Sequence, residues 1–172
     1  MSKPDPALLD GVVATKVLDA MRKASEALTR AGVRHVVAGG LAVGANGYPR
    51  ATRDVDFLVG GEAFEHHEGG LVTLRAGVPF QVDGIPVDFL SADAGEEHLN
   101  AALAAPAGSM LEAPPLIYLK LKSPRLKDRT DVVELVKAGI DVEACRRYLV
   151  AHAPALLASL DEAARRAAEE EE

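Results

Sequence analysis

The sequence lacks several features that would place it in a specialised class of protein. It has no tryptophan and a single cysteine, Cys145, so no disulfide can form within the chain; this is typical of a reducing compartment. No apolar run approaches the roughly 18 residues that a membrane span requires. The N-terminal stretch MSKPDPALLDG carries acids where a signal peptide has an apolar core. We therefore expect a cytoplasmic protein without a targeting or membrane segment.

The sequence also lacks a P-loop, because no G-x-x-x-x-G-K-[ST] motif is present. Its net charge of −7 argues against a surface dedicated to long nucleic acids. Between residues 116 and 130, however, five cations stand against one acid. A local cationic field in an acidic protein suits a small polyanion better than a long one.

The remaining composition is that of a globular protein. With 172 residues, of which 48% are hydrophobic, the chain can bury a substantial core. We expect one domain over residues 1–172, with a sheet-containing core over about 10–105 and a helical C-terminal part over about 112–168. The expected fold class is α+β, with helices packed on a small mixed or antiparallel sheet.

Hydrophobic periodicity and turn residues predict the elements of this fold. Residues 1–9 contain two prolines and are expected to be loosely held. The turn Asp83-Gly84 predicts a hairpin, and with it an antiparallel meander of strands 71–75, 78–82 and 85–90. The other expected strands are 34–38 and 55–59. The expected helices are 10–31, 41–46, 95–105, 114–122, 128–137, 141–151 and a last one from Pro154.

The stretch from Val36 to Val59 contains the first group of candidate site residues. Asp54 and Asp56 stand at the start of an expected strand, where alternate side chains point to the same face. Two neighbouring acids repel each other, and a divalent cation would reverse the sign of that interaction. Asp88 is a third acid on the polar face of a later expected strand.

A glycine pair precedes these acids. Gly39 and Gly40 lie between an expected strand and a helix N-terminus, where backbone N–H groups can approach a phosphate closely. Three acids and such a turn are the components of a two-metal phosphoryl or nucleotidyl transfer site. Mg²⁺ prefers carboxylate oxygens together with phosphates and water.

Each of these features has a structural alternative. The glycine pair could serve only the turn, the Asp-x-Asp pair could be a solvated edge or a cap, and Asp88 could be a surface acid. Arg50 could pair with a nearby acid. His66-His67 is interpreted as a solvated loop rather than a metal site, and Cys145 as a core residue. The cations Lys122, Arg125, Lys127 and Arg129 could form either a solvated helix end or a phosphate-binding surface.

The motif GGLAV followed by GYPRATRDVDFLV resembles the signature of the DNA polymerase β-like nucleotidyltransferase superfamily. The closest likeness is to the minimal bacterial branch that includes AbiEii-type toxin nucleotidyltransferases. IPVDFL resembles the strand that carries the third carboxylate, and LIYLKLKSPRLKDRTDVVELV resembles the C-terminal motif. The resemblance covers roughly residues 30–140 and implies the nucleotidyltransferase fold.

The resemblance also implies roles for individual residues. Asp54, Asp56 and Asp88 would be metal ligands, and Asp88 would also be the base for the incoming hydroxyl. Gly39, Gly40 and Lys120 would contact the nucleotide phosphates, and Thr52 and Arg53 would line the nucleotide mouth. Asp128 and Asp131 would organise a helix–helix junction, with Asp128 orienting Lys120.

These roles predict an enzyme that moves an NMP from an NTP to a hydroxyl of RNA or tRNA, a protein or a small molecule. Two Mg²⁺ ions, or Mn²⁺ in their place, are the expected cofactors. The resemblance also suggests the toxin of a toxin–antitoxin system, with an antitoxin as its protein partner. The alternative is a non-catalytic nucleotide sensor or toxin–antitoxin partner that retains the fold.

Overall fold

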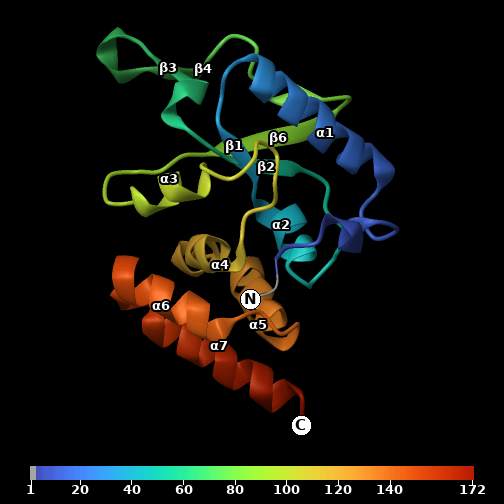
Figure 1. Cartoon of the computed structure of the whole chain (residues 1–172), viewed down its shortest axis with the longest axis vertical. Coiled ribbons are helices and arrows are strands. Elements are labelled where there is room, and N and C mark those ends of the chain that lie inside the picture. Colours follow the sequence, from blue (N-terminus) through green and yellow to red (C-terminus); the bar gives the residue numbers. More distant parts are fainter. Residues whose placement is uncertain (1–2) are drawn as a thin grey trace.

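A small mixed β-sheet is covered by helices and followed by a helical C-terminal part in the computed structural model, which describes residues 3–172 (Figure 1). The sheet has the strand order β1-β2-β6-β5. Its members are β1 (His35–Val37), β2 (Val55–Val59), β6 (Ile85–Leu90) and β5 (Gln81–Val82). β2 runs antiparallel to β1 and parallel to β6, whereas β5 runs antiparallel to β6. The α+β class expected from the sequence is confirmed.

Seven α-helices surround or follow this sheet within residues 3–172. They are α1 (Thr15–Arg30), α2 (Gly39–Ala45), α3 (His98–Ala102), α4 (Ala113–Lys122), α5 (Leu126–Lys137), α6 (Val142–His152) and α7 (Leu157–Glu170). Short 3₁₀ helices are η1 (Pro6–Leu9), η2 (Gly61–Ala63), η3 (Glu68–Gly70) and η4 (Pro154–Leu156). No helix in the described residues is both long and apolar enough to cross a membrane.

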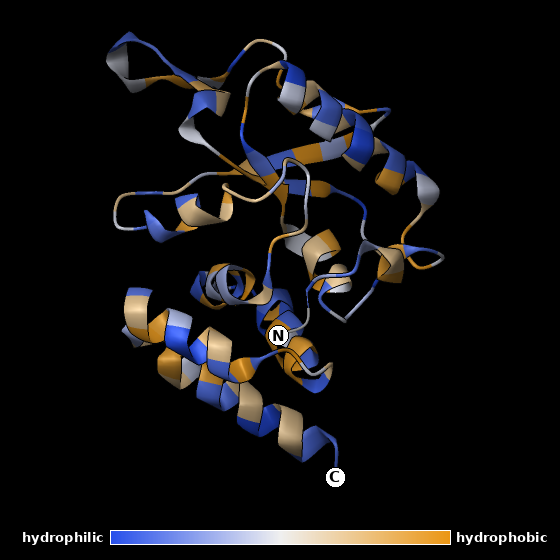
Figure 2. Cartoon of the chain, viewed as in Figure 1, coloured by the Kyte–Doolittle hydropathy of each residue, from blue (hydrophilic) through white to orange (hydrophobic). Residues whose placement is uncertain are grey.

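Hydrophobic side chains gather in two clusters. One joins α1 to the sheet through residues such as Val17, Leu28 and Phe57, all of them buried. The other joins α4, α5, α6 and α7 to one another and to the buried side of α2. Figure 2 shows hydrophobic and hydrophilic residues interleaved along α1 and α7, as expected for helices buried along one side only.

The predicted antiparallel meander is wrong. β4 (Val72–Leu74) pairs with β3 (Phe64–His66) in a separate two-stranded sheet, and not with β5. Gly69 and Gly70, both at positive φ, close this hairpin, whereas a turn at Arg75–Val78 separates β4 from β5. The strand β3 was not predicted because the residues around His66 are polar and lack the apolar pattern of a buried strand. The Asp83-Gly84 turn does form a hairpin, with Val82 opposite Ile85.

The N-terminal segment is held more firmly than its two prolines suggested. η1 packs beside α2, and the side chain of Leu9 is buried in the core. The backbone N–H of Asp5 donates to the carbonyl of Ala45 at 2.7 Å. The predicted loose segment is therefore wrong for residues 3–9, and residues 1–2 lie outside the described part of the chain.

Candidate metal centre

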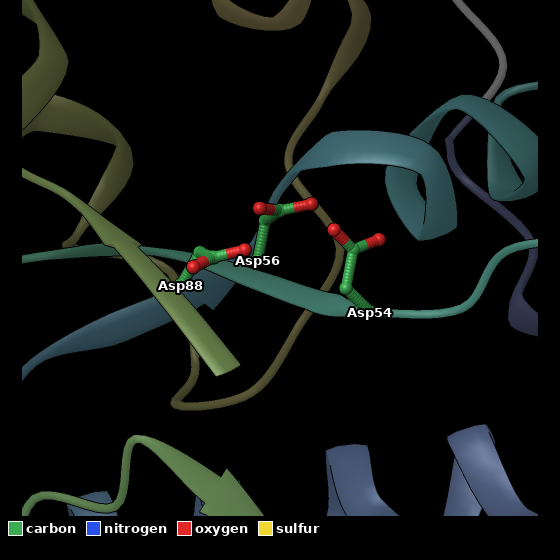
Figure 3. Close-up of side chains that lie close together, drawn as sticks. All are labelled: Asp54, Asp56 and Asp88. Carbon is green, nitrogen blue, oxygen red and sulfur yellow. The ribbon is translucent and has the colours of Figure 1, made fainter. Parts of the chain in front are cut away.

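Three carboxylates from two strands of the sheet lie together. Asp56 on β2 stands opposite Asp88 on β6 in the parallel pair, and Asp54 immediately precedes β2. One carboxylate oxygen of each residue lies within 4.8 Å of the other two. Figure 3 shows the three side chains projecting from one side of the sheet toward a common point. The juxtaposition expected from the sequence is thus present.

The electrostatics of these acids favour a cation. Burial, followed by repulsion from Asp54 and Asp88, raises the pKa of Asp56 to about 6. Lys120 and Arg125 oppose this rise but do not cancel it. Carboxylate oxygens are the hard ligands that Mg²⁺ and Mn²⁺ take, so the donor set fits the expected metal. A bound divalent ion would offset the repulsion that the protein alone leaves.

Gly39 makes room for Asp56. It begins α2 with a φ of +59°, and a Cβ placed on it would lie 2.0 Å from Oδ2 of Asp56. A Cβ on Gly40 would lie 3.0 Å from Oγ1 of Thr52. Any side chain here would collide with the acid or narrow the cleft. Because the first N–H groups of a helix have no partner within that helix, this turn offers unsatisfied donors beside the acids.

A cleft of about 610 Å³ opens over the three acids. It is bounded by the start of α2, the loop before β2, the strands β2 and β6, the end of α4 and the start of α5. Its lining includes most of the residues predicted for the site, namely Gly39, Gly40, Thr52, Asp54, Asp56, Asp88, Lys120 and Asp128. Arg53 lines a neighbouring hollow of about 380 Å³, which shares Thr52, Asp54 and Lys127 with the cleft.

Lys120 is buried and held by two acids. Its Nζ donates to Asp128 and to Asp131, at 2.9 Å in each case. Asp128 also accepts from Ser123 and from Nε of Arg125. Burial alone would raise the pKa of Asp128, but the hydrogen bonds from Ser123, Lys120 and Arg125 lower it to about 2. Asp128 thus fixes the position of Lys120 in the cleft wall.

Arg50 belongs to the same network, which sequence reasoning did not show. Its Nε and Nη2 donate to the two oxygens of Asp131 at 3.0 and 2.9 Å. The alternative that Arg50 pairs with an acid is therefore correct, but the acid lies 81 positions away in the sequence. No local pattern could have identified it.

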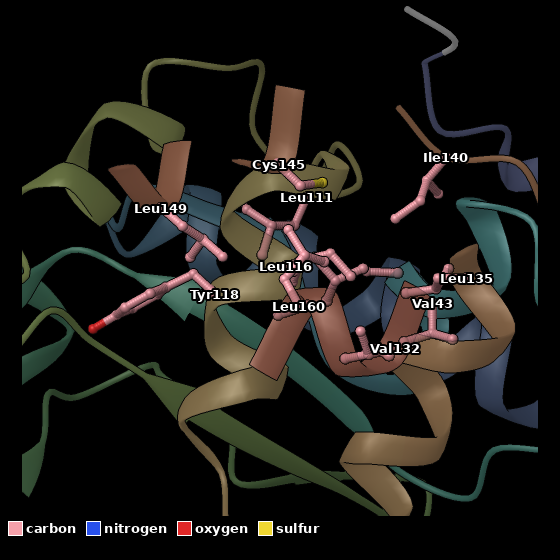
Figure 4. Packing of buried hydrophobic residues seen from close by; sticks show 14 of the residues in the cluster. Val43, Leu111, Leu116, Tyr118, Val132, Leu135, Ile140, Cys145, Leu149 and Leu160 are labelled. Atoms are coloured by element: carbon pink, nitrogen blue, oxygen red, sulfur yellow. The ribbon is translucent and has the colours of Figure 1, made fainter. Parts of the chain in front are cut away.

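The helices that carry this network are fixed by the second hydrophobic cluster. Leu116 on α4 and Val132 and Leu135 on α5 pack with Leu149 and Leu160 from α6 and α7 (Figure 4). All five side chains are fully buried. This packing sets the spacing of α4 and α5, and with it the positions of the charged residues at the cleft.

Two other candidates lie apart from the cleft. Cys145 is buried in the α4–α7 cluster, as expected for a core residue, and burial raises the pKa of its thiol to about 12. Such a thiol is not a nucleophile at neutral pH. His66 and His67 are exposed in and after β3, and His67 contacts Thr73 across that hairpin.

No protein-family model matches this sequence, and no curated protein is significantly similar to it. The resemblance to the nucleotidyltransferase superfamily therefore rests on short motifs, namely those around Gly39, Asp54 and Asp88 and the later segment that contains Lys120 and Asp128.

Proposed function

We propose that this protein is a metal-dependent nucleotidyltransferase that moves an NMP from an NTP to a hydroxyl acceptor and releases pyrophosphate. The observation that carries the proposal is the group Asp54, Asp56 and Asp88, with carboxylate oxygens within 4.8 Å of one another, beside the glycine turn at the start of α2. The motif resemblance to the polymerase β-like superfamily points the same way.

In this reaction the acceptor oxygen bonds to the α-phosphorus as the bond to pyrophosphate breaks. Asp54, Asp56 and Asp88 would hold Mg²⁺, which would supply Lewis-acid stabilisation of charge on the transferred phosphoryl group. Asp88 is the most exposed of the three acids and would take the proton of the incoming hydroxyl. Its exposure suits a group that must meet an acceptor from solvent.

The other cleft residues would orient the triphosphate. The N–H groups of Gly39 and Gly40 would donate to phosphate oxygens. Lys120 donates two of its three N–H groups to Asp128 and Asp131, so one remains for a phosphate. Donors fixed before the substrate arrives stabilise developing charge without reorganisation during the reaction.

The direct test is transfer of label from each α-³²P-NTP to total RNA, total protein or a small-molecule extract in the presence of Mg²⁺. We expect labelled product with at least one NTP and none with Asp56→Ala. Absence of both label transfer and NTP binding in the wild type would overturn the proposal. Binding of NTP without any transfer would favour the non-catalytic sensor.

The proposal extends to the toxin of a toxin–antitoxin system because the motifs resemble those of AbiEii-type enzymes. The expected result is growth arrest on induced expression, lost with Asp56→Ala at equal protein level. Undisturbed growth at high expression of the active enzyme would remove the toxin role and leave the enzymatic proposal intact.

A further inference from the structure

Arg50 presents a free nitrogen to the cleft. Its Nε and Nη2 are engaged by Asp131, but none of the hydrogen bonds within residues 3–172 uses Nη1. This third nitrogen lies 3.2 Å from the place that a Cβ on Gly40 would occupy. Arg50 therefore lines the cleft with an unused, charged donor directly beside the glycine turn.

Asp131 aligns this donor with Lys120. The side chain of Asp131 is only 2% exposed, and its Oδ2 accepts from both Nη2 of Arg50 and Nζ of Lys120, at 2.9 Å each. One buried carboxylate thus fixes two cations from distant parts of the chain, the loop before β2 and helix α4. Each cation keeps at least one N–H donor that Asp131 does not use.

The two acids of this network do not use every donor of the cations around them. Asp128 and Asp131 are contacted by three cations, namely Arg50, Lys120 and Arg125. A buried ion pair adds little stability compared with well-packed apolar side chains, so the pairing with Asp131 alone does not account for an arginine that lines the cleft with Nη1 unused. The planar guanidinium suits a phosphate, which it can contact at a fixed angle while its other edge stays on Asp131.

We propose that Arg50 is a phosphate-binding residue and that Asp131 is its positioning residue. Nη1 of Arg50 binds one phosphate of a polyphosphate, whose chain continues toward Lys120. This inference rests on the proposed function, and it assigns to Arg50 and Asp131 roles that the motif resemblance does not give them.

The experiment measures binding of inorganic tripolyphosphate with Mg²⁺ by isothermal titration calorimetry, so that the result does not depend on a nucleobase. Arg50→Lys keeps a cation against Asp131 but removes the guanidinium fork. Loss of one charge-assisted hydrogen bond is expected to weaken binding about 10- to 100-fold. Asp131→Asn keeps Nη1 of Arg50 but holds the guanidinium less firmly. This variant should therefore weaken tripolyphosphate binding less than Arg50→Lys does.

Arg34→Lys is the matched control. Arg34 makes the same type of two-pronged contact with Glu62, through Nε at 2.8 Å and Nη2 at 3.1 Å, and it does not line the cleft. This variant should bind tripolyphosphate within about twofold of the wild type, because it removes a surface fork and no cleft donor. Mn²⁺ binding in the absence of phosphate, followed by electron paramagnetic resonance, should be unchanged in Arg50→Lys.

Three results separate the outcomes. Wild-type affinity for tripolyphosphate in Arg50→Lys, with binding lost in Asp56→Asn, would overturn the role of Arg50 and leave the proposed function standing. Weaker Mn²⁺ binding in Arg50→Lys, in proportion to its loss of tripolyphosphate, would show that Arg50 acts only by supporting the metal site. A wild type that binds neither tripolyphosphate nor any NTP with Mg²⁺ would overturn both proposals.

Discussion

Asp56 and Asp88 stand directly opposite each other on the parallel strands β2 and β6. Both side chains project from the same face of the sheet, and Asp54 adds a third carboxylate to that face (Figure 3). The fold thus holds three like charges together, and the pKa of Asp56 is raised by burial and by repulsion from the other two acids. The arrangement costs stability in the free protein and favours a metal-bound state.

Asp56→Asn should stabilise the metal-free protein in a pH-dependent manner. The pKa of Asp56 is about 6 in the folded state against an ordinary value of 3.8, so the folded protein binds this proton more tightly than the unfolded chain does. The contribution of Asp56 to the free energy of unfolding therefore falls as the pH rises from about 4 to about 6, by at most about 3 kcal/mol. The Asp56→Asn variant does not lose this unfolding free energy, because its amide does not ionise.

Urea unfolding in EDTA at several pH values between 4 and 7.5 measures the effect. The advantage of Asp56→Asn over the wild type should be smallest near pH 4 and reach its full size above pH 6. An advantage that does not depend on pH would show that the amide improves packing and that Asp56 is not under electrostatic strain.

Divalent metal ions should stabilise the wild-type protein but not the Asp56→Asn variant. An ion that binds only the folded state raises the free energy of unfolding by an amount that grows with its concentration, about 2.7 kcal/mol at 100 times its Kd. Thermal unfolding with 0 to about 10 mM Mg²⁺ or Mn²⁺ should therefore show a rising Tm for the wild type. Asp54→Asn and Asp88→Asn should reduce this rise, and Ca²⁺ serves as a comparison for selectivity.

Gly39→Ala should damage both stability and metal binding. The residue has a φ of +59°, and the new Cβ would lie 2.0 Å from Oδ2 of Asp56. Backbone strain alone costs about 2 kcal/mol, and relief of the collision requires Asp56 to move away from its partners. Gly61→Ala is the control, because a Cβ there meets nothing within 4 Å and the backbone is not at positive φ. Equal unfolding free energies and equal Mn²⁺ affinities for the two variants would contradict this account.

Local parts of the fold could be predicted from the sequence because their causes are local. Prolines at Pro114-Pro115 start α4, the Asp83-Gly84 turn makes a hairpin, and the apolar residues from Val55 to Val59 give β2 within the expected bounds. The Asp-x-Asp spacing placed two acids on one face for the same reason. Such features need no knowledge of distant residues.

The pairing of strands could not be predicted in the same way. β6 pairs with β2 in parallel, and β4 pairs with β3. These pairings depend on packing between segments of the chain, and the residues of one strand alone do not identify its partner. The contact between Arg50 and Asp131 has the same origin. The site was therefore predictable as a set of acids and glycines, but not as a charged network that joins the loop before β2 to α4 and α5.

Lys120→Met should destabilise the protein strongly because it removes a cation shared by two buried acids. The side chains of Asp128 and Asp131 are only 3% and 2% exposed. Without Lys120, Asp128 would keep its contacts with Ser123 and Arg125. Asp131 would keep only its contact with Arg50. Leaving buried charge undercompensated costs on the order of 3 kcal/mol. The loss in urea unfolding free energy should be largest at neutral pH and shrink under acid conditions, where Asp128, whose pKa is low only because of its hydrogen bonds, can take up a proton instead.

Lys23→Met is the control for removing a lysine from an ion pair. Lys23 contacts Asp83 at 2.6 Å, but both side chains are more than half exposed, and water screens such pairs. No measurable change in Tm is expected for this variant. If both lysine variants lost the same stability, the buried network would add no more than a surface pair does, and Lys120 would be held in the cleft by packing rather than by its two acids.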